Sequence, residues 1–297
     1  DHQVLELYRQ ALEIYRRYRD YQGESTVLNN LCGVFSRLGD FENAIATLRQ
    51  SETIAQRLDD ALSLAIVHYN LAETYTDTNQ PLLAAEYFAR YEVSNARIHN
   101  ALGDGYLRFG QGSLAVLQGN LPLAAQHYSE ARTIFTDLGS RQLALQSALQ
   151  LIKSRLLMHQ KEIALHELAE IETNDLHELA ANTLGDLVFT RGLASFTIAS
   201  GCNDPTLAQA ETLFRQSLDV EPNPPIYESM ERRYYLMMTL DRLGRNTEAD
   251  TICSSACALL EERLQQIRNP RLRRCMLERG IIPSLSARYQ ALTGRQL

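Results

Sequence analysis

The sequence predicts an all-α protein made of stacked helix pairs, and three observations support this prediction. Apolar residues recur at the three- and four-residue spacing of an amphipathic helix in nearly every segment. The first such segment contains Val4, Leu5, Tyr8, Ala11, Leu12 and Tyr15. No segment alternates apolar and polar residues with the period of two that a half-buried strand requires. The third observation is an internal repeat of about 40 residues, which is typical of stacked repeat architectures.

The repeat is visible as an alanine that follows a turn signal at a nearly constant step. These alanines are Ala44, Ala84, Ala124, Ala164, Ala210 and Ala249, separated by 40, 40, 40, 46 and 39 residues. The turn signals are Gly39-Asp40, Asn79-Gln80, Gly119-Asn120, Gln160-Lys161, Gly201 and Gly244. The longer step contains an insertion at 202–205 in a turn between helices. The sequence therefore predicts that each repeat contains two helices of about 15 to 18 residues joined by short turns.

Taken in order, the elements predict a solenoid over 1–268, made of a half repeat and six helix pairs. Residues 3–19 carry the pattern of a second helix whose first helix is absent. We therefore expect either that the chain is a fragment, or that a partner or a second copy covers this N-terminal edge. Asn269-Pro270 breaks the pattern, and Pro283 separates two short helices expected near 270–278 and 284–293. Residues 269–297 are thus predicted to form C-terminal capping helices.

Composition narrows the class of protein. The chain has 297 residues, 45% of them apolar, and a net charge of -7. No run of about 18 apolar residues predicts a membrane span, and five cysteines without framework spacing favour a reducing, cytoplasmic location. The acidic balance makes nucleic acid an improbable partner. Residues 261–297 differ, because eight arginines and three glutamates give them a charge of +5 and leave -12 on the rest.

Some motifs in the sequence resemble those that bind a cofactor or a metal, but a role in helix packing explains them better. Gly110-x-Gly112-x-x-Ala115 matches a dinucleotide fingerprint as text, but it lies inside a predicted helix with no strand before it. Cys253 and Cys257 share a helix face without the second ligand pair of a zinc site. No nucleophile elbow, phosphate loop or kinase signature is present. We therefore expect no catalytic residue, no metal, no cofactor and no enzyme activity in this chain.

The repeat resembles the tetratricopeptide repeat family. The positions that carry the resemblance are Leu28, Leu31, Cys32, Phe35, Gly39, Ala44 and Leu48, then Ala210, Phe214 and Pro222, and finally Leu236, Leu240, Gly244 and Ala249. The resemblance covers about residues 1–267. The 40-residue step departs from the usual 34, and is similar to the longer variety of kinesin light chains, Leu-Gly-Asn repeat adaptors and bacterial MalT-type regulators. It implies a right-handed superhelical α-solenoid.

In this family the first helix of each pair lines a concave face, where ligands bind. The resemblance implies the following inward residues here: Asn29, Arg37, Tyr69, Glu73, Asp77, Tyr106, Phe109, Gln150, Arg191, Tyr234 and Met238. This mixture of aromatic, polar and charged side chains suits an extended peptide or a protein helix. It does not reproduce the residue set with which some family members bind a C-terminal carboxylate, because only Asn29 matches.

Two functions follow as expectations. The first is a protein- or peptide-binding module, forming the sensory or scaffold part of a larger bacterial signalling or transcription-regulatory protein. The alternative is a small-molecule-sensing regulatory domain with a pocket on the concave face, lined by Tyr69, Tyr106, Phe109 and Tyr234. Self-association through the N-terminal edge is a third, weaker expectation.

Overall fold

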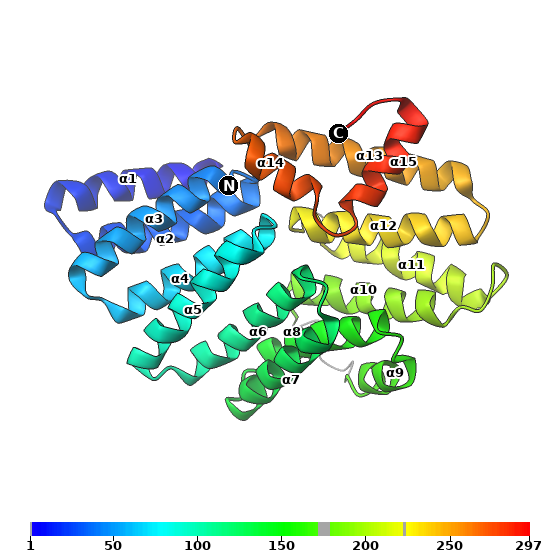
Figure 1. The fold of residues 1–297 in the computed structure, drawn as a ribbon, viewed down its shortest axis with the longest axis horizontal. Helices are drawn as coiled ribbons and strands as arrows, with labels where there is room; N and C mark the ends of the chain where they lie inside the picture. The colour runs from blue at the N-terminus through cyan, green and yellow to red at the C-terminus, as the bar shows by residue number, and fades with distance from the viewer. Residues whose placement is uncertain (1, 172–178, 222–223) are drawn as a thin grey trace. The chain divides into compact units, whose positions relative to one another are not determined.

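The computed structural model describes residues 2–171, 179–221 and 224–297, and these residues form fifteen helices and no strand (Figure 1). The helices are α1 (His2–Tyr18), α2 (Tyr21–Leu38), α3 (Phe41–Leu58), α4 (Ala61–Asp77), α5 (Pro81–Ile98), α6 (Ala101–Leu117), α7 (Leu121–Asp137), α8 (Arg141–Leu157), α9 (Lys161–Ala169), α10 (Ala181–Ile198), α11 (Pro205–Val220), α12 (Ile226–Arg242), α13 (Asn246–Gln265), α14 (Pro270–Leu277) and α15 (Ile282–Thr293). The all-α prediction is confirmed. Pro222, which contributes to the repeat resemblance, lies outside the described residues.

The helices have similar lengths because their turns recur every twenty residues. A residue with positive φ ends a helix at Arg19, Gly39, Asp59, Asn79, His99, Gly119, Gly139 and His159. The next residue is the N-cap of the following helix, which begins one residue later. The Asp20, Asp40 and Asp60 side chains each accept a hydrogen bond from the backbone N–H three residues later. A left-handed residue followed by an N-cap stops one helix and starts the next within two residues.

The repeated alanines occupy the closest-packed positions. All six, from Ala44 to Ala249, have no exposed surface. A larger side chain at such a position would push neighbouring helices apart, since ridges and grooves interlock at close range. Several of the predicted helix pairs pack against each other, namely α2 with α3, α4 with α5, α8 with α9, and α10 with α11.

The chain forms two compact units. Unit 1 contains residues 1–118 and 263–276, and unit 2 contains residues 119–262 and 277–297. The core of unit 1 includes Leu31, Leu48, Leu71 and Tyr87. In unit 2, the buried rings of Phe189 and Phe214 lie 5.5 Å apart, and Tyr235 packs against both. The predicted boundary at residue 268 falls inside a segment that belongs to unit 1.

That segment, 263–276, joins unit 1 from the far end of the sequence. Its buried side chains are Leu264, Ile267, Leu272 and Met276. The Asn79 side chain donates a hydrogen bond of 2.7 Å to the Cys275 carbonyl, and the Asn269 backbone N–H donates to the Glu42 carboxylate. The turn after α4 and the start of α3 are thus both held by residues about 200 positions away.

Two sequence motifs serve packing. Gly110 lies inside α6, where an added Cβ would meet the Phe88 ring at 2.3 Å. Cys253 and Cys257 are fully buried, and both thiols donate weakly to the Leu285 carbonyl on α15. The packing interpretation of both motifs is therefore supported by direct contacts.

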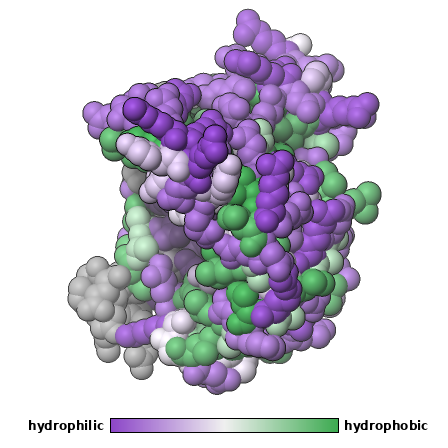
Figure 2. Space-filling model, turned by 90° about the vertical axis from the view of Figure 1, so that its left-hand side faces the viewer, coloured by the Kyte–Doolittle hydropathy of each residue, from purple (hydrophilic) through white to green (hydrophobic). Residues whose placement is uncertain are grey.

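The surface is mainly hydrophilic on the face drawn in Figure 2, where hydrophobic side chains form separate groups among polar ones. On α1, Leu7 and Tyr18 expose 65% and 74% of their surface. Within the described part of the chain, no helix has the length and apolar character needed to cross a membrane.

Candidate functional site

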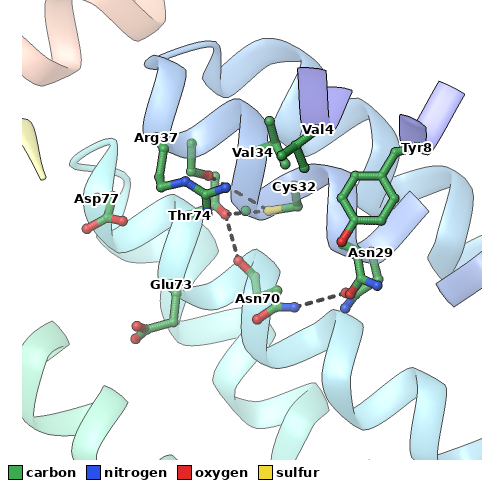
Figure 3. Close-up of a pocket in the computed structure, with 13 residues that line it drawn as sticks. Val4, Tyr8, Asn29, Cys32, Val34, Arg37, Asn70, Glu73, Thr74 and Asp77 are labelled. Atoms are coloured by element: carbon green, nitrogen blue, oxygen red, sulfur yellow. Dashed lines mark hydrogen bonds between the residues drawn. The ribbon is translucent and has the colours of Figure 1, made fainter. Parts of the chain in front are cut away.

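A pocket of about 450 Å³ lies in unit 1, between α1, α2 and α4 (Figure 3). Its lining residues are Val4, Tyr8, Asn29, Asn30, Cys32, Gly33, Val34, Ser36, Arg37, Asn70, Glu73, Thr74 and Asp77. The first helices of two successive repeats, α2 and α4, supply most of them. Four of the eleven predicted site residues therefore share one pocket: Asn29, Arg37, Glu73 and Asp77.

A chain of hydrogen bonds crosses the pocket wall from α4 to α2. The Asn70 side-chain amide donates to the Asn29 side-chain oxygen at 2.9 Å, and the Thr74 hydroxyl donates to the Asn70 carbonyl at 2.7 Å. The Cys32 thiol lies 3.8 Å from the Thr74 hydroxyl, and burial raises its pKa, so it stays a neutral thiol. The bond between Asn70 and Asn29 orients both carboxamides, whereas the Thr74 hydroxyl bonds the backbone carbonyl of Asn70 within α4.

The charged side chains of the pocket carry both signs. Glu73 and Asp77 lie one turn apart on α4, and Figure 3 shows them extending from the same side of that helix. Arg37 comes from the last turn of α2 and reaches toward Thr74. Carboxylates accept hydrogen bonds, a guanidinium donates them, and carboxamides do both. The pocket can therefore pair with the alternating donors and acceptors of a peptide backbone.

Of the aromatic residues predicted for the site, Tyr69 packs among other rings in unit 1 and does not line the pocket. The Tyr69 ring packs at 5.3 Å from Tyr91, 5.6 Å from Tyr106 and 6.2 Å from Phe88. Burial, followed by the charge of Glu73, raises the pKa of Tyr69 well above its usual value. Tyr69, Tyr106 and Phe109 belong to unit 1 but do not line the pocket.

The other predicted site residues belong to unit 2, on α8, α10 and α12. The Gln150 side chain donates to the Asp186 carboxylate at 3.2 Å, and the Tyr234 ring meets Tyr235 at 5.6 Å. Arg191 and Met238 are partly buried. None of the four contributes to the unit 1 pocket.

Unit 2 holds a buried charge cluster that the sequence prediction missed. Arg232 is 1% exposed and donates to the Ser217 carbonyl at 2.9 Å and to Glu221 at 2.7 Å. Its guanidinium also lies 3.4 Å from Asp186, which is 3.7 Å from the Lys153 ammonium. The one available signal is Lys153, since only two lysines occur in the chain.

Glu228 belongs to the same cluster, at 3.7 Å from Arg232. Burial and the negative charge of Asp186 raise the pKa of Glu228 to about 8, against the opposing effect of Lys153 and Arg232. The side chain is nevertheless 39% exposed. The protein therefore surrounds the Glu228 carboxyl closely enough to penalise its charge while part of the side chain keeps contact with water.

A second pocket, of about 440 Å³, lies between α7 and α8 in unit 2. It is lined by Pro122, Ala125, Gln126, Ser129, Glu130, Arg155, Met158 and Gln160. None of the predicted site residues is among them. Nearby, Arg155 forms an ion pair with Glu167, which fixes one wall.

Comparison with known proteins gives one family match over part of the chain and similar folds among solved structures. Residues 3–56 and 23–92 match the tetratricopeptide repeat profile. No curated protein is a significant sequence match. The fold is similar to that of a Rap protein complexed with Competence and Sporulation Factor, with a TM-score of 0.69 and 12% identity over 89% of this chain and 71% of that one.

The fold is also similar to that of NprR in complex with its cognate peptide NprX. The TM-score is 0.62, with 13% identity over 98% of this chain and 84% of NprR. At these identities the likeness concerns the fold. Residues 3–92 are tetratricopeptide repeats, within an all-helical fold similar to the folds of the Rap protein and NprR.

Proposed function

We propose that this chain is a peptide-binding regulatory module without catalytic activity, whose ligand lies in the unit 1 pocket. The observation that carries the proposal is the pair of carboxamides, Asn29 and Asn70, fixed by a hydrogen bond between the inner helices. Asn30 adds a third carboxamide to the lining.

Carboxamides recognise a peptide backbone because each offers a donor and an acceptor at the spacing of a peptide group. An extended peptide needs such partners, whereas a helix satisfies its own backbone groups. The pocket therefore suits an extended segment. Glu73, Asp77 and Arg37 then offer charged partners for side chains or termini of that segment.

The comparisons support this function by analogy. NprR is in complex with a cognate peptide, and the Rap protein is complexed with a factor of competence and sporulation. A similar fold in this chain makes a regulatory role in bacterial signalling the natural extension. We propose that the chain forms the sensory part of such a system.

A small-molecule ligand is the second candidate, because a volume of about 450 Å³ lies within the usual range of small-molecule sites. A peptide would extend beyond the pocket, whereas a small molecule would fit within it. A small molecule has no peptide backbone for the Asn29–Asn70 pair to bind.

The test is a peptide selection followed by titration. The full chain is incubated with a mixture of random short peptides, and retained peptides are identified by mass spectrometry. Each is then synthesised and titrated by calorimetry. We expect a retained peptide to bind the protein, and the Asn70→Ala variant to bind it about fivefold more weakly, since a lost hydrogen bond costs about 1 kcal/mol.

The matched control is Gln56→Ala, which removes an exposed carboxamide of α3 in the same unit. It should leave the affinity unchanged. Equal weakening by both variants, or an absence of any retained peptide, would contradict the proposed function. Binding of metabolites but not peptides would support the small-molecule candidate.

A further inference from the structure

Helix α1 leaves a row of apolar side chains exposed along one side. Leu7, Ile14 and Tyr18 expose 65%, 55% and 74% of their surface, and they are named here the α1 stripe. Their spacings of seven and four residues place them on one face of the helix. None of them lines the unit 1 pocket. Exposed apolar side chains that are grouped in this way mark an interaction surface.

The rest of α1 holds the stripe in a fixed position. Leu5 is buried, and α1 packs against α2, which follows it in the chain (Figure 1). The Tyr15 ring lies directly over Gly23 of α2, where an added Cβ would meet it at 2.4 Å. Arg16 forms an ion pair with Glu24 of α2 at 2.8 Å. The stripe is thus presented by a docked helix.

The charges beside the stripe favour a second copy of this chain as its partner. Glu6 and Arg17 are eleven residues apart, and so are Leu7 and Tyr18. Eleven residues make about three helical turns, so each pair runs along one side of α1. A two-fold axis passing α1 near residue 12 therefore brings Glu6 of each copy beside Arg17 of the other. Within the described residues Arg17 forms no ion pair, and the Glu6 carboxylate accepts a hydrogen bond only from Gln10.

The same two-fold arrangement matches the apolar side chains. Antiparallel contact places Leu7 of one copy beside Tyr18 of the other, with Ile14 close to the axis. Arg9 and Arg16 lie on the opposite side of α1 from the stripe, so they do not repel each other across the contact. One helix face therefore complements itself in both shape and charge.

We infer that the α1 stripe is the contact surface between two copies of this chain, packed as antiparallel α1 helices about a two-fold axis. Such a contact uses the same patch on both copies, so one apolar row and one pair of opposite charges supply both sides of it. Helix α1 is about 25 Å long, and a contact of that length lies at the small end of specific interfaces. The dimer is therefore reversible, with a Kd on the order of 10 μM. This inference does not depend on the proposed function.

The experiment measures the mass of the full chain by sedimentation equilibrium over about 1 to 200 μM. We expect the mass to rise from that of one copy toward that of two. The Leu7→Ser/Tyr18→Ser variant should stay monomeric, because it removes apolar contacts on both sides of the axis. The control is Leu62→Ser/Leu82→Ser, which removes two exposed leucines elsewhere in unit 1 and should associate like the unaltered protein. Circular dichroism verifies that each variant is folded.

Charge reversal tests the orientation of the two helices. Glu6→Arg and Arg17→Glu should each weaken association on the order of tenfold, since each places like charges together at both ends of the contact. An equimolar mixture of the two variants should recover the dimer, because every facing pair is then opposite in charge. A protein that is monomeric at all concentrations would overturn the inference. The same holds if the control weakens association as much as the stripe variant, or if the mixture associates no better than either variant alone.

Discussion

The Asn70 side chain donates a hydrogen bond to the Asn29 side chain at 2.9 Å, which joins the inner helices of two successive repeats. Each carboxamide keeps one further donor or acceptor available for a ligand. Any movement between α2 and α4 would alter the distance between them. The proposed peptide contact therefore depends on the spacing between these two repeats.

We expect the Asn29→Ala variant to lose about 1 kcal/mol of stability in unit 1, because Asn70 loses its acceptor. A peptide retained by the unaltered protein should bind this variant about fivefold more weakly, which corresponds to one lost hydrogen bond of about 1 kcal/mol. Hydrogen exchange of α2 and α4 measures the first effect, and calorimetry measures the second. Asn30→Ala should not destabilise α4, since Asn30 is exposed. A destabilised variant with unchanged affinity would show that the pair is purely structural.

Glu52 should make unit 1 sensitive to acid. It is buried, and burial alone would raise its pKa. The hydrogen bond from His68 and the charges of Arg49 and Arg90 outweigh that effect and hold the pKa of Glu52 below its ordinary value of 4.5. The folded state therefore keeps this carboxylate ionised where the unfolded chain protonates it. Its contribution is complete above pH 4.5 and is lost as pH falls through the folded pKa.

We expect Glu52→Gln to cost about 2 kcal/mol at neutral pH and to flatten the loss of stability in acid. Urea denaturation at a series of pH values, followed by hydrogen exchange in α3 to α5, measures both effects. Glu86→Gln is the matched control, because Glu86 also pairs with Arg90 but is half exposed. It should cost less than about 0.5 kcal/mol. Equal costs would contradict the assigned role of burial.

Glu228 predicts the opposite pH dependence in unit 2. Its pKa of about 8 in the folded state exceeds its ordinary value of 4.5. Between these values the folded protein holds a proton that the unfolded chain releases, so stability falls as pH rises. Glu228→Gln should remove this dependence and stabilise unit 2 by about 1 kcal/mol above pH 8, after allowance for solvent screening of a partly exposed side chain.

The measurement for Glu228 is the urea midpoint between pH 5 and pH 9. Glu162→Gln, at an exposed position on α9, is the control and should parallel the unaltered protein. If the curve of Glu228→Gln also paralleled that of the unaltered protein, the pKa of the Glu228 carboxyl in the folded state would not be raised, and the prediction would be wrong.

The turn residues allow a stabilising substitution. His99 ends α5 with φ of 49° and ψ of 46°, a left-handed conformation that disfavours any residue with a Cβ. Its side chain makes no hydrogen bond or ion pair within the described residues. His99→Gly should therefore stabilise unit 1 by about 0.5 to 1 kcal/mol, measured as a higher urea midpoint. His99→Ala, which keeps the Cβ, should give no gain.

Local patterns explain why the sequence predicts the helix pairs so well. A left-handed residue such as Gly39, an N-cap such as Asp40 and a small residue such as Ala44 act within a few positions of one another. They define the turn and the close packing together. The 20-residue recurrence of these features is therefore sufficient to place most helices.

The inward positions of the first helices include four pocket residues, Asn29, Arg37, Glu73 and Asp77. Val4 and Tyr8 lie on α1, whose sequence pattern is that of a second helix, so their place in the pocket depends on how neighbouring repeats stack. The buried position of Arg232 escaped prediction, since sequence alone does not distinguish a solvated arginine from one enclosed by acidic neighbours. The docking of Cys275 beside Asn79 has no local signal at all.

The docking of segment 263–276 has a consequence for how the protein is made. Asn79 leaves the ribosome 196 residues before Cys275, to which it bonds in the finished fold. At ordinary translation speeds this interval lasts roughly ten to forty seconds. During that time the nascent repeats of unit 1 lack the residues that complete them, so this step of assembly awaits the synthesis of residues 263–276.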